Sequence, residues 1–498
     1  MQLVAYGAQD IYLTGNPQIT FFKVVYRRHT NFSMEEIAQS ASGSVNFGSE
    51  ATFIISRNGD LVHKMYVEHT HTGTAGTRLC ANYGSALLKE VELEIGGQRI
   101  DKHYGEWLHI WNELSQKPGL KEGYANMVGN VPRLTQFVTS STDNNPNVTH
   151  ADTSTTVDMP KVTLYIPLQF WFCKNPGLSL PLVALQYHDI EINVDFEELS
   201  KCKAGQDVSV SLSNTSLYVD YIYLDTDERR RFAQASHEYL IEQVQFTGSE
   251  AVTQSINNIK LSFNHPVKEL IWVVQKDSHI ATPSSNNDTD KYGGQQWFNF
   301  TDAIDKTFFS GTPGDPLGGG LHNSRVGTFP LTKSGADDVR DVDSGTNPSP
   351  AGTWANMILA NMGIIGAGVI GGSLGSGGGD YDTTGVPIFD SGLNPVAKAK
   401  IQLNGSDRFS ERDGRYFNLV QPYQHHTNIP STGINVYSFG LTPEEHQPSG
   451  TCNMSRVDKA TLQLTLTSNT GSAKVRVYAL GYNVLRIMSG MGGLAYST

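Results

Sequence analysis

The segment of this chain that most closely matches a cofactor-binding motif is rich in glycine. Gly366-Ala-Gly368-Val-Ile-Gly371 has the glycine spacing of a dinucleotide-binding fingerprint. That chemistry needs the third glycine inside a helix whose N-terminus faces a pyrophosphate. Residues 372–379 are mostly glycine, which cannot sustain a helix. We therefore interpret residues 366–379 as an exposed surface loop and predict no cofactor.

Histidines are the next candidates for chemistry. His69 and His71 would point to the same face of a strand, and His63 is close to them in sequence. A metal site needs a third and a fourth ligand at defined distances, and the sequence offers none. We interpret His69 and His71 as a solvated strand end and predict no metal site. His425 and His426 are weaker candidates, because neighbours in a strand point to opposite faces.

Catalytic carboxylates and nucleophiles are not indicated. A nucleophile elbow of the Gly-x-Ser-x-Gly type does not occur, and no cysteine stands in a recognisable catalytic setting. The acidic pairs are neighbours in sequence, so their carboxylates need not converge, and we interpret them as charged surface. They are Glu35-Glu36, Glu197-Glu198 and Glu444-Glu445. The sequence predicts no catalytic residue, and we expect no enzymatic activity.

Two short basic clusters could contact negatively charged partners. Residues 229–231 are three arginines among acidic neighbours, which is typical of a helix start or an interface. Residues 26–29, Tyr-Arg-Arg-His, form the better basic patch, which could face a negative interior surface or form structural ion pairs. The net charge of −12 argues against direct nucleic-acid binding by the chain as a whole.

Composition favours an all-β chain of two or more domains. The chain has 498 residues, 49 of them glycine, with 10% aromatic and only 17% charged residues. Four widely spaced cysteines without a Cys-x-x-Cys pair fit a reducing compartment; they are Cys80, Cys173, Cys202 and Cys452. The N-terminus lacks the pattern of a signal peptide, and no run of residues is apolar enough to span a bilayer.

Strand patterns dominate, and they occur in two similar halves. Apolar residues alternate in segments 91–95, 190–194, 462–466 and 475–478, whereas helical patterns cover only Tyr104–Leu114 and Asp227–Gln243. A strand and a glycine turn at Gly97 resemble those at Gly405, with one extra residue expected in the second turn. Pro176, Ile190 and Ile192 precede Pro448, Leu462 and Leu464 by one constant separation. These matches indicate a duplicated β domain.

Several long, non-repetitive segments resemble the major capsid proteins of large icosahedral DNA viruses, the nucleocytoplasmic large DNA viruses. The resemblance is strongest to the proteins of algal, phycodnavirus-like viruses such as the chlorella viruses, and it covers nearly the whole chain. The segments that carry it are Val4–Asp10, Asn16–Phe32, Ser56–Asp60, Gly96–His103, Pro181–His188, Asp225–Phe246, Gln447–Asn453 and Tyr482–Tyr496.

The resemblance implies two consecutive eight-stranded jelly-roll β-sandwiches, in agreement with the duplication. We expect an N-terminal arm over residues 1–24, a first jelly roll over 25–224, a connection over 225–243 and a second jelly roll over 244–498. A long surface insertion is expected at about residues 286–394. The family's trimers have six jelly rolls and form pseudo-hexagonal capsomers, which explains why the duplication is useful.

The resemblance also implies partners and a location. We expect a homotrimer that contacts neighbouring capsomers and minor capsid proteins, with the N-terminal side toward an internal viral membrane. The protein would be made in the host cytoplasm and assembled into the virion capsid. Asn287 and Asn299 lie in the expected outward loop region, which makes them the candidate glycosylation sites.

Two alternatives from other functional classes remain. The first is a carbohydrate-binding or carbohydrate-active β-sandwich, which would need an aromatic platform beside convergent carboxylates in one half. The second is a flavin or nicotinamide enzyme, which rests on residues 366–371 alone.

Overall fold

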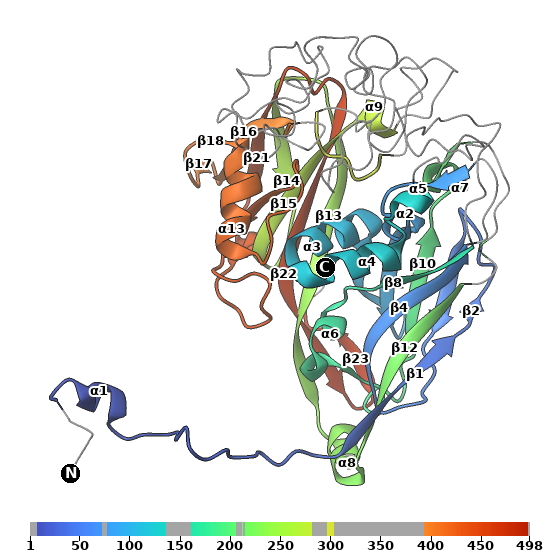
Figure 1. Ribbon diagram of the computed structural model, residues 1–498, viewed down its shortest axis with the longest axis vertical. Coiled ribbons are helices and arrows are strands. Elements are labelled where there is room, and N and C mark those ends of the chain that lie inside the picture. The colour runs from blue at the N-terminus through green and yellow to red at the C-terminus, as the bar shows by residue number, and fades with distance from the viewer. Residues whose placement is uncertain are drawn as a thin grey trace, which may run out of the picture.

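The computed structural model describes residues 7–71, 77–135, 161–205, 212, 215–280, 296–302 and 393–496. The described chain begins as an extended arm that contains the short helix α1 (Asp10–Thr14). Figure 1 shows this arm projecting away from the body before it enters strand β1 (Phe32–Gln39). The body consists of two β-sandwiches, one built from each half of the chain.

The first sandwich consists of two antiparallel sheets. The first sheet has the order β1, β12 (Thr215–Leu224), β4 (Leu61–His71) and β8 (Val162–Pro167), with β9 (Leu180–Pro181) beside β4. The second sheet has the order β2 (Ala41–Ser42), β3 (Glu50–Ile54), β10 (Ile190–Phe196), β6 (Leu88–Ile95) and β7 (Gln98–Tyr104). A separate small sheet pairs β5 (Thr77–Leu79) with β11 (Lys203–Gly205).

The second sandwich repeats this plan. Its first sheet has the order β13 (His237–Val252), β22 (Ala473–Met488), β15 (Pro266–Lys276) and β19 (Asn435–Ser438), with β20 (Cys452–Asn453) and β23 (Met491–Leu494) at its margins. Its second sheet has the order β14 (Ile256–Leu261), β21 (Ala460–Leu466), β16 (Val396–Leu403) and β17 (Ser406–Asp407), with β18 (Arg412–Asp413) beside β16.

The strand orders confirm the duplication that the sequence indicated. β10 and β21 occupy equivalent central positions, with β3 or β14 on one side and the β6–β7 or β16–β17 hairpin on the other. Burial alternates strictly along β10 and β21, as expected for strands with one face in a core. The four alternating segments of the sequence all lie in strands, namely β6, β10, β21 and β22.

Helices lie in the connections. Those of the first half are α2 (Tyr83–Leu87), α3 (Gly105–Ser115), α4 (Lys121–Val128), α5 (Pro132–Thr135), α6 (Trp171–Lys174) and α7 (Leu199–Cys202), with 3₁₀ turns at Pro118–Leu120 and Pro176–Leu178. The described part of the second half has α9 (Asp277–Ile280), a π-helical turn at Tyr416–Val420, α13 (Gln421–His425) and a 3₁₀ turn at Met454–Arg456. The helix expected at Tyr104–Leu114 is confirmed as α3.

The helix expected over Asp227–Gln243 is wrong in its second half. Helix α8 (Thr226–Gln234) begins after its N-cap Asp225 and ends at Gln234, and β13 starts at His237. The strand prevails because residues 237–252 pair with β22 almost along their whole length. Helical spacing of three apolar residues is a weak signal beside such pairing.

Part of the expected surface insertion is also buried. Most of residues 286–394, including the glycine motif at 366–371, lies outside the described residues. Residues 296–302 are described, and Phe300 is only 1% exposed. The indole nitrogen of Trp297 donates to the carbonyl of Lys201 at 2.7 Å. This short stretch therefore packs against the body, contrary to the expectation of a surface loop.

The two glycine turns are more alike than the sequence predicted. Ile95 pairs with Gln98 and Leu403 pairs with Ser406, so each turn has two residues and the expected extra residue is not in the second turn. Gly97 has φ +77° and Gly405 has φ +82°, and both preceding residues also have positive φ. This is the type I′ geometry that favours glycine in two-residue hairpins.

Replacing either turn glycine with valine should therefore destabilise its sandwich by roughly 1–3 kcal/mol through backbone strain. A Cβ at Gly97 or Gly405 would meet nothing within 4 Å, so no steric clash adds to this cost. Thermal melting of Gly97→Val and Gly405→Val checks the prediction. Gly119→Val is the matched control, because its Cβ also meets nothing and its φ is not positive. Equal melting temperatures for all three variants would contradict it.

Candidate functional site: the junction between the two sandwiches

Helix α3 of the first half is buried between the two sandwiches (Figure 1). Trp107 and Trp111 stack at 5.6 Å between ring centroids and are 1% and 3% exposed. They belong to a hydrophobic cluster that is distinct from the two sandwich cores and draws on both halves. Its buried members are Trp107, Ile110, Trp111, Leu114, Val244, Ile271, Val273, Phe300, Ile434, Val436, Tyr478 and Leu480. This cluster joins the two sandwiches.

Polar contacts fix the N-terminal end of α3 to the second sandwich. Glu106 accepts a hydrogen bond from the Tyr478 hydroxyl at 2.7 Å and forms an ion pair with Arg476 at 2.8 Å. The same guanidinium nitrogen donates to Gln275 Oε1 at 2.8 Å. A largely buried acid and base that are both hydrogen-bonded favour one relative position of the sandwiches, because displacement would leave their charges unpaired.

The other end of α3 is capped by a loop of the second half. The backbone N–H of Asn428 donates to the carbonyl of Leu114 at 3.0 Å. The Asn428 side-chain amide reaches the carbonyls of Leu114 and Gln116. The last carbonyls of a helix have no hydrogen-bond donors within the helix. Here a residue of the second sandwich donates the hydrogen bonds that these carbonyls accept.

A buried cluster of charges lies beside this junction. Glu242 accepts from Lys268 Nζ at 2.6 Å and from Lys174 Nζ at 3.1 Å. Lys174 belongs to the first half, and its ammonium lies 4.0 Å from the ring centroid of Trp111. The glutamate between two lysines thus links α6 of the first half to β13 and β15 of the second.

His426 completes a second, adjacent triad. Its imidazole is fully buried, with Nε2 at 2.9 Å from Glu269 and Nδ1 at 2.9 Å from Glu444. Burial disfavours the charged ring, but the two carboxylates outweigh burial and raise the pKa of His426 to about 9. Protonated His426 gives the combined cluster three positive and three negative groups.

No pattern in the sequence singles out the residues of this network. His426 was interpreted as a weak candidate and Glu444 as charged surface, yet both are members of this network. His426 follows helix α13 instead of lying in a strand, so the argument from strand alternation did not apply. A charge network assembled from α6, β13, β15 and two loops has no spacing signal in the chain.

The interpretation of His69 and His71 as a solvated strand end is wrong. Both side chains are buried at the end of β4, with rings 6.0 Å apart, and His69 Nδ1 lies 3.0 Å from the Thr215 hydroxyl. Burial lowers the pKa of His69 to about 3 and that of His71 to about 4, so both are neutral core residues. Within the described residues, no group of three metal-ligating side chains is close enough to hold an ion.

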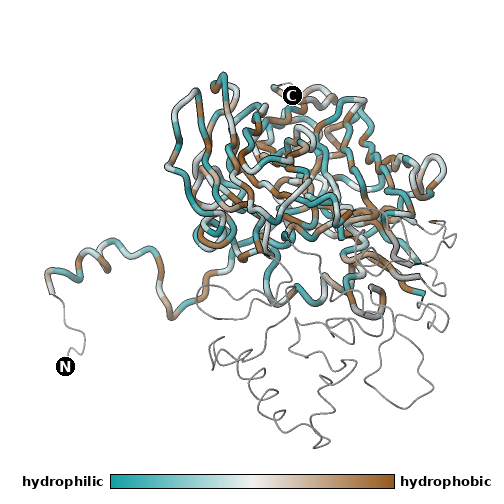
Figure 2. Tube along the Cα trace, turned by 90° about the horizontal axis from the view of Figure 1, so that it is seen from above, coloured by the Kyte–Doolittle hydropathy of each residue, from teal (hydrophilic) through white to brown (hydrophobic). Residues whose placement is uncertain are grey.

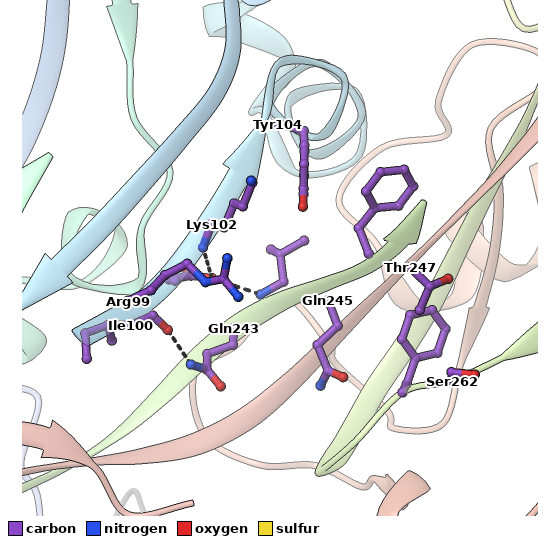
Figure 3. Close-up of a pocket in the computed structure, with 12 residues that line it drawn as sticks. Arg99, Ile100, Lys102, Tyr104, Gln243, Gln245, Thr247 and Ser262 are labelled. Carbon is purple, nitrogen blue, oxygen red and sulfur yellow. Dashed lines mark hydrogen bonds between the residues drawn. The ribbon is translucent and has the colours of Figure 1, made fainter. Parts of the chain in front are cut away.

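A hollow of about 340 Å³ lies between β7 and β13 (Figure 3). Its polar walls are already used: Gln243 donates to the Ile100 carbonyl, and the backbone N–H of Val244 donates to Asp101 at 3.2 Å. Lys102 pairs with two glutamates of β6 at 2.6 and 2.7 Å. Because these polar groups already have partners, we interpret the hollow as a packing gap at the junction and not as a ligand site.

The remaining candidate residues are dispersed. Asn287 lies outside the described residues. Asn299 is half-buried, with its amide donating to Gln296 Oε1 at 2.7 Å and its carbonyl oxygen accepting from the Thr301 hydroxyl at 2.7 Å.

The basic clusters and the cysteines also lie apart from the junction. Arg229 pairs with Asp60 at 2.6 Å, whereas the basic patch at residues 26–29 is exposed on the arm. The four cysteines are free thiols. No helix in the described part of the chain could span a membrane.

The charge cluster makes the free energy of unfolding depend on pH in the alkaline range. Since the pKa of His426 is raised above its usual 6.5, its contribution is complete below pH 6.5 and is lost as pH rises toward about 9. The shift corresponds to a contribution on the order of 3 kcal/mol. We expect the difference in thermal stability between the parent and His426→Gln to be largest near pH 6 and to shrink by pH 9.5.

The matched control for that measurement is His425→Gln. His425 is its half-buried neighbour in the chain, and its Nδ1 lies 2.8 Å from the carbonyl of Leu441. Its melting temperature should follow that of the parent at every pH. A constant difference between His426→Gln and the parent from pH 6 to 9.5 would contradict the assignment of a protonated His426.

Two family models match nearly the whole chain. Residues 20–225 match the major capsid protein N-terminus, and residues 228–493 match the large eukaryotic DNA virus major capsid protein. The boundary between the two matches lies at the start of α8.

Curated relatives match the chain over its full length. The chain is 49% identical to the major capsid protein of Phaeocystis pouchetii virus, over 100% of this chain and 99% of that protein. It is 40% identical to the major capsid protein of Paramecium bursaria Chlorella virus 1, over 100% of this chain and 98% of that protein.

Solved structures agree in fold. The quasi-atomic model of the PBCV-1 virus capsid is 34% identical, with a TM-score of 0.64 over 96% of this chain and 100% of that chain. The Faustovirus major capsid protein is only 14% identical but has a TM-score of 0.66, over 97% of this chain and 94% of that chain, which shows the shared fold. These neighbours are double jelly-roll proteins, so the all-β fold of two consecutive jelly rolls is confirmed. Matched in sequence and in fold along almost its whole length, the chain belongs to the family of large eukaryotic DNA virus major capsid proteins and is a component of the virion.

Proposed function

We propose that this chain trimerises into pseudo-hexagonal capsomers that build an icosahedral capsid, and that it has a structural role without catalysis. The observation that carries the proposal is the repeated strand order of two sandwiches held together by the α3 junction. Three copies of such a chain present six similar units, so a threefold assembly can occupy a near-hexagonal lattice. A junction with buried ion pairs suits this role, because capsomer shape depends on a constant angle between the sandwiches.

Further parts of the proposal concern domains and partners. We divide the chain into an arm (1–24), a first jelly roll (25–224), a connection (225–243) and a second jelly roll (244–498). The arm side would face minor capsid proteins and an internal membrane, and synthesis would take place in the host cytoplasm without direct contact to nucleic acid. Asn287 and Asn299 remain the candidate glycan sites, although the hydrogen bonds of Asn299 would have to break first.

The carbohydrate-binding alternative has one supporting observation. Tyr66, Tyr165 and Tyr218 cluster beside Glu36 and Asp220 on the outer face of the first sandwich. This is the combination of aromatic platform and carboxylates that such a function requires. The capsid proposal is better supported, because relatives match the chain over its full length.

The oligomeric state tests the proposal directly. Light scattering of the purified protein should give three times the chain mass of 54.5 kDa, and negative-stain images should show hexagonal outlines. A monomer mass at micromolar concentration, unchanged by salt and pH, would contradict capsomer formation.

The junction should determine the shape of the trimer. Trp111→Ala removes a buried indole and should cost about 3–5 kcal/mol, loosening the two sandwiches relative to each other. We expect a lower melting temperature and irregular outlines in negative stain. Tyr423→Ala is the matched control, because Tyr423 is an aromatic residue of the second half that is 77% exposed. Regular hexagonal outlines for Trp111→Ala would show that the junction does not set the shape.

A further inference from the structure

The outer face of the sheet β1-β12-β4-β8 carries an unusual group of tyrosines. The rings of Tyr66 on β4 and Tyr218 on β12 stack at 5.2 Å with an angle of 6° between planes. Tyr165 on β8 meets Tyr66 edge-on at 5.8 Å and is 38% exposed. Three strands thus contribute to one aromatic surface, on the side of the sheet that faces away from the core.

Two carboxyl groups lie directly opposite each other beside these rings. Glu36 on β1 and Asp220 on β12 are partners in the strand register, and the Tyr66 hydroxyl donates to Glu36 Oε2 at 2.9 Å. Burial, followed by the nearby Glu36 carboxylate, raises the pKa of Asp220 to about 6. Lys64 and Glu68 are the other charged groups of β4 that act on this cluster.

This arrangement is unfavourable for a face that meets only water. Like charges directly opposite each other in a sheet destabilise it. Lys64 is the single cation among these four charged groups, so negative charge remains on the face. A cation supplied from outside would neutralise the carboxyl pair and could also lie over a tyrosine ring, which is favourable for arginine in particular. The face is therefore complementary to a segment that combines arginine with aromatic residues.

The N-terminal arm is such a segment. Phe21, Phe22 and Tyr26 are 89%, 98% and 86% exposed, so they contact almost nothing of their own chain. Arg27 and Arg28 follow directly, are exposed, and form no ion pair within the described residues. Figure 2 shows the arm projecting from the body as an extended segment of mixed polarity. Large apolar side chains exposed together mark an interaction segment.

We propose that residues 21–28 of one copy dock on the tyrosine–carboxyl face of a neighbouring copy, with Arg27 or Arg28 between Glu36 and Asp220. This inference rests on the proposed trimer and names the surfaces that join its subunits. The arm can reach a neighbour, because about ten extended residues span roughly 33–36 Å. A contact in which each arm binds the next copy closes into a ring when three copies complete a threefold rotation.

Site-specific cross-linking of the full-length protein tests the proposal. A photoreactive amino acid replaces Tyr26, and mass spectrometry identifies the attached peptide. We expect covalent links between two chains, with the attached peptide in residues 61–71, 162–167 or 215–224. The same amino acid at Tyr423, which is similarly exposed on the second sandwich, is the control and should not label these peptides.

Charge exchange provides an independent test. Arg27→Glu with Arg28→Glu should weaken subunit association about tenfold or more, and so should Glu36→Lys with Asp220→Lys. Combining all four changes should restore association at least in part. Exchanging Lys398 and Glu411, an exposed pair at 3.7 Å, is the matched control and should change nothing. If the lysine variants fail to fold, Glu36→Gln with Asp220→Asn tests the same contact without introducing positive charge.

The outcomes separate this inference from the proposed function. Trimers whose cross-links lie elsewhere, or only within one chain, would overturn the arm contact and leave the capsomer proposal intact. The absence of trimers would overturn both. Trimers that ignore the charge exchange, together with glycan binding that is lost in Tyr218→Ala, would assign the face to carbohydrate and overturn the arm contact.

Discussion

The arrangement of this molecule depends on one pair of strands that belongs to both hydrophobic cores. β13 and β22 each have 16 residues and pair antiparallel over most of that length. At one end, Ile241, Leu485 and Ile487 are buried in the core of the first sandwich. At the other end, Val252, Ala473 and Val475 are buried in the core of the second. The sandwiches cannot rotate far against each other without breaking this ladder, so strand pairing limits the angle between them and the α3 junction holds it.

Helix α3 and the charge cluster build on that constraint. Once β13 and β22 place the sandwiches, the gap between them is filled by Trp107 and Trp111, and its edges are closed by hydrogen bonds to both ends of α3. Four of the six charged groups beside this gap are buried (Glu242, Lys268, Glu269 and His426), which is costly unless every charge is compensated. Compensation requires the proton on His426, which makes the junction geometrically specific and sensitive to alkaline pH. A shell subunit benefits from the specificity, because errors in angle accumulate over a lattice.

The body and the arm differ in how far their apolar side chains are exposed to solvent. In the body, most apolar side chains lie in the hydrophobic cores. In the arm, aromatic residues are exposed beside arginines, and no part of the described chain covers them. The tyrosine–carboxyl face is complementary to the arm, because it has exposed aromatic rings and an excess of negative charge. These features make sense together if the folded chain is only part of the functional unit.

Patterns within the amino-acid sequence are sufficient to predict the fold class, the duplication and the family. Alternating segments such as Ile190–Val194 and the paired turns at Gly97 and Gly405 are local signals, set by side-chain period and by backbone conformation. The resemblance to capsid proteins likewise depended on contiguous segments. The other features could be found only in the folded chain: the burial of His69 and His71, the end of α8 at Gln234, and the triads around Glu242 and His426. These depend on burial and on contacts between residues far apart in the chain, such as Lys174 with Glu242 and Glu106 with Arg476. Such contacts leave no periodicity in the sequence, because each partner is supplied by a different element and only packing brings the two together.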